Sequence, residues 1–164
     1  MANSTFSLGI SALTAAFAII ALSFGPVAAT EKIISPNEAY DLSVKNQLTV
    51  IDIRSPKEWA ESGVPQGAWA ITMHNPQGKN AFLEAIRDAV GGDTRYPIAL
   101  ICAVGGRSRW AQRFLAENGF SNVSDISEGM FGRGKGKPGW LKRNLPVQPC
   151  PTADHTTATS CLSR

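Results

Sequence analysis

The sequence predicts an α/β fold: a single domain with a central parallel sheet flanked by helices on both faces. Short apolar runs rich in β-branched residues occur at 48–53 and 98–101, as is typical of strands buried on both faces, and a last short strand is predicted at 123–126. Helix-like segments alternate with these runs, which favours parallel strands joined by helical crossovers. The length of 164 residues fits about one domain, and 43% hydrophobic with 18% charged residues excludes a chain that is disordered or collagen-like as a whole.

Two predicted helices in the first half of the chain begin with the same residue pattern. Ser35 and Ser55 are the expected N-caps, and each is followed by a proline at the first helical position. Glu38 and Glu58 stand three residues after these caps and complete two capping boxes. A short strand is predicted at 68–71, after the second of these helices.

The second half of the body contains two longer helix patterns. Residues 80–90 place their apolar side chains on one helical face, and the pair Gly91 and Gly92 ends this helix. Residues 108–118 form the next predicted helix, which Gly119 stops before the last strand. Both helices are expected to pack their apolar faces on the sheet.

The N-terminal segment 1–29 is predicted to be a secretory signal peptide. Residues 6–24 are apolar or small throughout, and Val27, Ala28 and Ala29 place small residues where a signal peptidase cleaves, after Ala29. The segment lacks Lys and Arg, so a retained membrane anchor formed by 6–24 is the alternative. The prediction is therefore an exported protein, periplasmic or secreted, without a membrane attachment once the segment is removed.

The remaining chain divides into a domain at 30–147 and a tail at 148–164. The tail is rich in Thr, Ser, Ala and Pro, and is expected to be flexible. Cys150 and Cys161 lie in this tail, and in an oxidising compartment they are expected to pair as a disulfide. The alternative is that one of them reaches Cys102 and resolves or protects it.

Charge and metal-ligand content exclude several classes of function. The net charge is only +3, which gives little support to nucleic-acid binding. Residues 31–94 carry 6 basic and 9 acidic side chains, whereas 95–144 carry 9 basic and 3 acidic ones. This basic second half would attract small anions. Two histidines and three cysteines without a paired spacing predict no metal site, and no cofactor is expected.

The chemistry concentrates where the predicted strand 98–101 meets the helix that follows it. Cys102 comes directly after the strand, and the connecting loop consists of Ala103, Val104, Gly105, Gly106, Arg107 and Ser108. Two consecutive glycines allow backbone N–H groups to point inward as an anion-binding nest, and the helix N-terminus adds positive potential. Because both effects and the guanidinium favour a thiolate, Cys102 is expected to have a lowered pKa and to act as a nucleophile.

This loop resembles the active-site loop of rhodanese-like sulfurtransferases. Three further stretches agree in order along 34–147. The first comprises Asp52 to Arg54, Glu58-Trp59 and Gly63 to Ala68; the second runs from Gly119 to Val123, and the closing segment runs from Glu128 to Val147. The resemblance implies that Cys102 takes a sulfane sulfur from a donor as a persulfide and passes it to a thiophilic acceptor.

The resemblance also implies roles for the loop and for a nearby ion pair. The N–H groups of 103–108 would stabilise the persulfide anion, and Arg107 would hold an anionic donor or orient the loop. Asp52 and Arg54 would brace the fold as an ion pair. The expected partners are a small anionic sulfur donor such as thiosulfate, a thiol or cyanide acceptor, or a sulfur-carrying protein; the chain is expected to be a monomer.

Two stretches of the chain depart from the family pattern. The family often has Gly-His-Ile where Gly63, Val64 and Pro65 stand here. Ala103 and Val104 are uncharged where efficient thiosulfate users often carry basic residues, which favours a persulfide or small thiol as donor.

Two alternative functions remain open. One alternative is a non-catalytic binding or sulfur-carrier module that uses the same loop. The other, a cysteine phosphatase, is disfavoured because those enzymes have one more residue between Cys and Arg.

Overall fold

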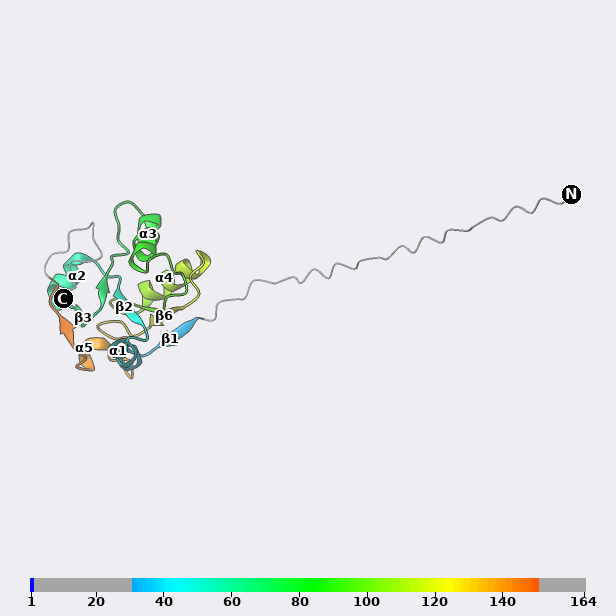
Figure 1. The fold of residues 1–164 in the computed structure, drawn as a ribbon. Helices are drawn as coiled ribbons and strands as arrows, with labels where there is room; N and C mark the ends of the chain where they lie inside the picture. The colour runs from blue at the N-terminus through cyan, green and yellow to red at the C-terminus, as the bar shows by residue number, and fades with distance from the viewer. Residues whose placement is uncertain (2–30, 151–164) are drawn as a thin grey trace.

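The central sheet of the computed structural model has five parallel strands in the order β1-β6-β5-β2-β4 (Figure 1). The structure describes Met1 and residues 31–150. The sheet strands are β1 (Lys32–Ile34), β2 (Thr49–Asp52), β4 (Trp69–Ala70), β5 (Ile98–Ile101) and β6 (Val123–Ile126). The predicted parallel sheet is confirmed, with the predicted cysteine strand β5 at its centre.

Helices cover both faces of this sheet, as predicted. The described helices are α1 (Pro36–Val44), α2 (Pro56–Ser62), α3 (Lys79–Ala89), α4 (Gly106–Glu117) and α5 (Gly139–Lys142). In Figure 1, α1 and α5 lie on one side of the sheet, and α3 and α4 lie on the other. Each layer encloses its own apolar cluster, so the sheet is buried from both sides.

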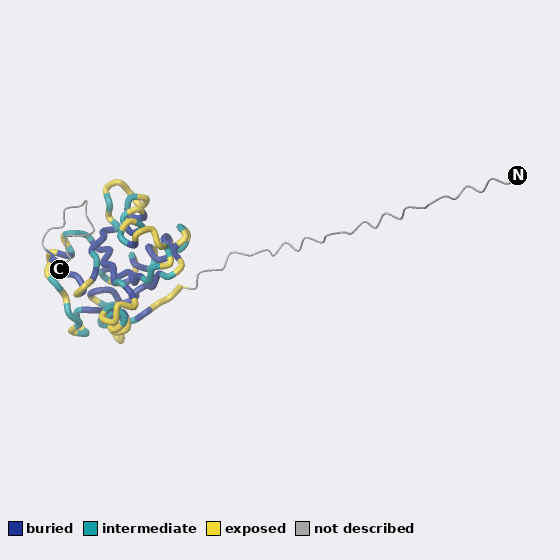
Figure 2. The backbone as a smooth tube through the Cα atoms, viewed as in Figure 1, coloured by how far each residue is buried: buried dark blue, intermediate teal, exposed yellow. Residues whose placement is uncertain are grey.

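Alternation along the strands explains why continuous apolar runs are required. Ile98 and Leu100 of β5 enter the cluster beneath α3 and α4, whereas Ala99 and Ile101 enter the cluster beneath α1 and α5. All four side chains are buried. Figure 2 shows the inner strands as the dark blue centre of the molecule, whereas the edge strand β1, the outer helix surfaces and the loops carry the exposed segments.

The two predicted N-caps are present, and one of them forms a complete capping box. Ser35 Oγ accepts a hydrogen bond from the Glu38 N–H at 3.2 Å. Ser55 Oγ accepts from the Glu58 N–H at 3.4 Å, and the Ser55 N–H donates to Glu58 Oε2 at 3.0 Å. This second box fixes the position of the Glu58 carboxylate at the start of α2.

The helix after the cysteine strand begins two residues earlier than predicted. Gly105 has a φ of 84° and forms the N-cap, so Gly106 and Arg107 already belong to the first turn of α4. The sequence pattern assigns Gly106 and Arg107 to the loop, whereas the left-handed Gly105 already turns the chain into the helix.

Strand pairing continues past residue 147, where the end of the domain is predicted. Val147 and Gln148 form β7, which pairs antiparallel with β3 (Val64–Pro65). Cys150 is buried beside Trp59 and is disulfide-bonded. Backbone pairing and apolar burial therefore extend the fold to at least residue 150; the predicted partner Cys161 and the rest of the tail lie outside the described residues.

The predicted signal segment 1–29 also lies outside the described residues, apart from Met1. Among residues 31–150, no helix has the length and apolar character needed to cross a bilayer.

Candidate active site

The candidate site is the turn that joins the end of β5 to the start of α4. Cys102 follows Ile101, the last residue of β5, and Gly105 closes the turn before α4 begins. Strand β5 lies between β2 and β6, so the turn emerges at the carboxyl edge of the sheet. In α/β folds this edge gathers the loops that carry the chemistry.

The Cys102 thiol is free, and polar groups of its own loop surround it. The Gly105 N–H donates a hydrogen bond to Cys102 Sγ at 3.1 Å. Ser108 Oγ lies 3.5 Å from the same sulfur. Cys102 and Ser108 have no exposed surface. The Gly105 N–H is thus placed to hydrogen-bond negative charge on this sulfur.

The closing segment after β6 holds the loop in place from outside. The Met130 N–H donates to the Cys102 carbonyl at 2.9 Å, and the Phe131 N–H donates to the Ala103 carbonyl at the same distance. The Gly105 α-carbon lies so close to the Ser127 backbone that a Cβ at position 105 would overlap the Ser127 carbonyl oxygen. The loop therefore requires glycine both for its φ and for this close approach.

Arg107, the predicted ligand of an anionic donor, has two side-chain partners. Its Nη2 donates to Glu58 Oε1 at 2.6 Å, and its Nη1 donates to Glu58 Oε2 at 2.9 Å. Nη1 also lies 2.9 Å from Nε2 of the exposed His74. The fork-shaped guanidinium thus joins α4 to α2 and to the loop after β4.

The charge state of Glu58 follows from this arrangement. The hydrogen bonds from Arg107, with those from Ser55, lower the pKa of Glu58 to about 2 against the opposing effect of burial. The same pairing raises the pKa of Arg107. Both groups are therefore ionised at neutral pH, and much of the positive charge next to Cys102 is balanced by Glu58.

Asp125 of β6 extends the site inward from the loop. Ser108 Oγ donates a hydrogen bond to Asp125 Oδ1 at 2.6 Å. The Asp125 side chain has no exposed surface, and Arg109 Nε lies 3.8 Å from Oδ2. Burial raises the pKa of Asp125, although the bond from Ser108 opposes this change.

The outer side of the loop is apolar. Val104 is 46% exposed, and Ala103 is partly exposed beside it. Phe131, whose N–H is bonded to Ala103, is 43% exposed. The loop side chains at 103 and 104 thus bring no charge to the surface around the thiol.

A buried ion pair supports the neighbouring strand end. Arg54 Nη2 lies 2.6 Å from Asp52 Oδ2, and both side chains have no exposed surface. Arg54 also donates to Ser62 Oγ at 2.7 Å and to the Gly63 carbonyl at 2.6 Å. This confirms the predicted bracing pair, which ties the end of β2 to the end of α2.

Three residues of the site were not predicted from the sequence. Glu58 was expected only as a helix cap, His74 was given no role, and Asp125 was included in a buried strand. For Asp125 a signal existed, because a carboxylate inside a strand buried on both faces needs a specific polar partner. Nothing local in the sequence links Glu58 or His74 to Arg107.

Among the described residues, no group of three or more His, Cys, Asp or Glu side chains is arranged to hold a metal ion. The polar groups around Cys102 instead form hydrogen bonds and ion pairs with one another.

The parallel sheet with flanking helices defines an α/β protein, and a free cysteine lies in a strand-to-helix turn at the carboxyl edge of its sheet. The model of the rhodanese-like domain matches residues 35–132, which includes this loop. The chain belongs to the rhodanese-like domain family, as the sequence resemblance implied.

Relatives and solved structures agree with this membership. A thiosulfate sulfurtransferase GlpE of Actinobacillus pleuropneumoniae is 30% identical over 115 residues, covering 70% of this chain and 91% of the relative. An uncharacterized protein of Rickettsia rickettsii is 30% identical over 125 residues, covering 70% and 95%. The polysulfide-sulfur transferase homodimer from Wolinella succinogenes is similar with a TM-score of 0.54 and 26% identity, covering 73% and 79%. Rv0390 from M. tuberculosis shares the fold, with a TM-score of 0.57 and 23% identity over 71% and 96%.

Proposed function

We propose that the protein is a sulfurtransferase that carries a sulfane sulfur as a persulfide on Cys102. The observation that carries this proposal is the Gly105 N–H, which is directed at the sulfur of a free cysteine over 3.1 Å. The same donor would stabilise negative charge on a thiolate and on an added sulfur. Similarity to sulfur-transferring relatives supports this assignment.

The reaction consists of two displacements at sulfur. In the first, the Cys102 thiolate attacks the outer sulfur of the donor, and the bond between the two donor sulfurs breaks with its electron pair going to the leaving group. Thiosulfate would leave sulfite, and a persulfide would leave a thiolate. In the second, an acceptor nucleophile attacks the terminal sulfur, and the electron pair of the sulfur–sulfur bond returns to Cys102. These steps predict ping-pong kinetics.

Some residues of the loop would stabilise negative charge on sulfur, and others would affect which donor can bind. The N–H groups of 103–108 would face the added sulfur, and Arg107 would keep the loop in register through Glu58. Since Ala103 and Val104 carry no charge, we expect a persulfide to be a better donor than thiosulfate.

The second candidate is a non-catalytic binding or sulfur-carrier module. Two observations favour it: Cys102 has no exposed surface, and the Arg107 guanidinium is already bonded to Glu58 and His74. A module of this kind would exchange sulfur only with a partner that opens the loop. A phosphatase remains less favoured, because only four residues separate Cys102 from Arg107.

Intact-mass measurement distinguishes the candidates. After incubation with thiosulfate or with a small persulfide, the sulfurtransferase should gain the mass of one sulfur and lose it on adding cyanide. The Cys102→Ser variant should gain nothing. If no adduct forms with any small donor, the sulfurtransferase proposal fails and the carrier module is supported.

Export is a further part of the proposal. We expect cleavage after Ala29 to release a monomer into the periplasm or the medium. Mass spectrometry of the protein purified from its natural host should find Thr30 at the N-terminus. A chain that begins at Met1 in the membrane fraction would instead support an anchor formed by 6–24.

A further inference from the structure

Three buried side chains form a continuous polar chain behind the loop. Cys102 Sγ lies 3.5 Å from Ser108 Oγ, and Ser108 Oγ lies 2.6 Å from Asp125 Oδ1. All three residues have no exposed surface. The chain connects the end of β5, the first turn of α4 and the middle of β6.

The direction of these hydrogen bonds follows from the groups involved. The Ser108 hydroxyl donates to the Asp125 carboxylate, which leaves the Ser108 oxygen free to accept the thiol proton of Cys102. Asp125 Oδ2 has no hydrogen-bond partner among the described residues, and Arg109 Nε at 3.8 Å is too far to donate to it. The carboxylate is thus buried with half of its bonding capacity unused, which favours its neutral form.

Two acidic groups joined in this way do not ionise independently. A thiolate and a carboxylate in one dry site repel each other, so the pair is most stable with a single negative charge. We propose that Cys102 and Asp125 share one proton through Ser108, and that Asp125 acts as the positioning residue and proton acceptor that sets the charge state of the thiol.

The charged groups that face the pair favour one negative charge. Arg109 and Arg133 attract negative charge at Asp125, whereas Glu31 opposes it. On the cysteine side, Arg107 is the facing cation, and Glu58 balances much of its charge. Burial of Asp125 raises its pKa, whereas the hydrogen bond from Ser108 opposes this change.

This inference rests on the proposed sulfur transfer for its role in the reaction. On loading, the Cys102 proton moves to Ser108 Oγ while the Ser108 proton moves to Asp125 Oδ1, and the sulfur attacks the donor as a thiolate. On release, the electron pair of the broken sulfur–sulfur bond returns to Cys102 Sγ, and the proton travels back from Asp125 through Ser108. No oxidant or reductant is needed, and the site keeps one negative charge while the thiolate forms.

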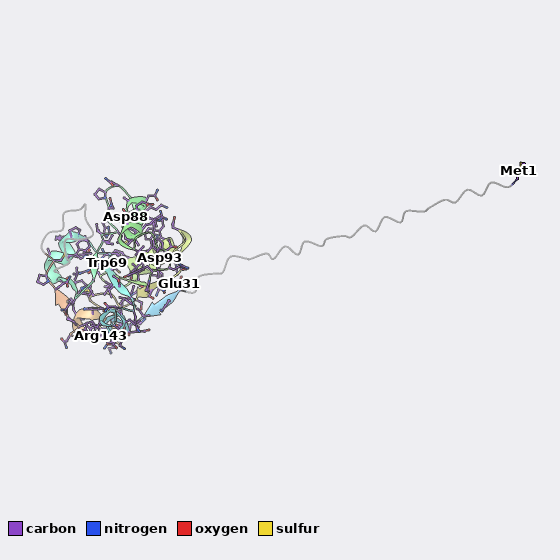
Figure 3. The ribbon with its side chains drawn as sticks, in the orientation of Figure 1. Met1, Glu31, Trp69, Asp88, Asp93 and Arg143 are labelled. Carbon is purple, nitrogen blue, oxygen red and sulfur yellow. The ribbon has the colours of Figure 1, made fainter. Side chains whose placement is uncertain are left out.

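The first test measures alkylation of Cys102 by iodoacetamide as a function of pH, with no sulfur donor present. In the native protein, the alkylation rate should be nearly independent of pH around neutrality and should rise again at alkaline pH, so that its pH profile has two steps. In Asp125→Asn a single step should replace them at lower pH, with alkylation at pH 7 faster by at least about tenfold. Asp88→Asn is the matched control: it removes the exposed carboxylate labelled on α3 in Figure 3 and should leave the profile unchanged.

The Ser108→Ala variant distinguishes proton transfer through the Ser108 hydroxyl from the electrostatic effect of the Asp125 carboxylate. It retains the Asp125 carboxylate but removes the hydroxyl that stabilises the thiolate, so the rate around neutrality should fall below that of the native protein. Superimposable profiles for the native protein and Asp125→Asn would overturn the proposal.

A second measurement applies even if Asp125→Asn does not fold. Coupling is reciprocal, so removal of the thiol must change the titration of the carboxyl. In the Cys102→Ala variant, the ¹³C chemical shift of the Asp125 carboxyl should titrate in one step, whereas the native protein should show a second, alkaline component. Identical curves in the two proteins would refute proton sharing. Because neither measurement uses a sulfur donor, a failed sulfur-loading assay and a failed coupling test remain distinct outcomes.

Discussion

Arg107 Nη2 donates to Glu58 Oε1 over 2.6 Å and so links the first turn of α4 to the first turn of α2, across 49 positions of sequence. The same carboxylate caps its own helix through Ser55. Glu58 therefore connects a local feature, the capping box, to the orientation of the cysteine loop. Arg143 and Glu128 form a comparable pair beneath α5, at 2.7 Å, where Figure 3 labels Arg143 at the edge of the domain.

Replacing Glu58 by Gln should destabilise the protein by about 1–2 kcal/mol, because the pair is partly buried and its guanidinium would lose a charged partner. Urea unfolding measures this change. Glu84→Gln is the control: Glu84 also pairs with an arginine at 2.7 Å, but that pair is exposed, so the loss should stay below about 0.5 kcal/mol. Equal losses in both variants would contradict the role assigned to Glu58.

The contribution of Glu58 should depend on pH. Its pKa is lowered from 4.5 to about 2 in the folded protein, so the unfolded chain binds the proton more tightly. The stabilisation is fully present above pH 4.5 and is lost as the pH falls toward about 2. The difference in unfolding free energy between the native protein and Glu58→Gln should therefore be smaller at pH 3 than at pH 7. A difference that grows on acidification would show that the pKa is not lowered.

Gly105→Ala should destabilise the protein by more than about 3 kcal/mol and should prevent sulfur loading, because the new Cβ would overlap the Ser127 carbonyl oxygen. Gly91→Ala provides the matched control, since Gly91 also has a positive φ, of 62°, but open space around it. That variant should lose only about 1 kcal/mol. Thermal unfolding of both variants separates the steric overlap from backbone strain alone.

Val104→Lys should improve the use of thiosulfate, because it adds a positive charge at an exposed position of the loop. We expect kcat/KM for thiosulfate to rise by about three- to tenfold at low ionic strength and the gain to shrink at high salt. Val44→Lys, at an exposed position at the end of α1, controls for the change in net charge. An equal gain in both variants would mean that the charge acts at long range and not at the loop.

Local sequence patterns were sufficient to predict most of the helices and strands. Strands β2, β5 and β6 and the serine caps of α1 and α2 depend on neighbours within a few residues. The start of α4 was predicted two residues late, and β7 was missed, because both depend on contacts with distant backbone. Gly105 lies against Ser127, and Val147 pairs with Pro65.

Three features follow from the amino-acid sequence: the parallel sheet, the position of Cys102 at the end of a central strand, and the glycines that let the loop close around the sulfur. These features depend on side-chain periodicity and on backbone freedom, which a linear sequence records. The folded structure was needed to show that Glu58 and His74 bond Arg107 and that Ser108 joins Cys102 to Asp125. Such partners are determined by which strand ends and helix turns lie next to one another in the folded chain.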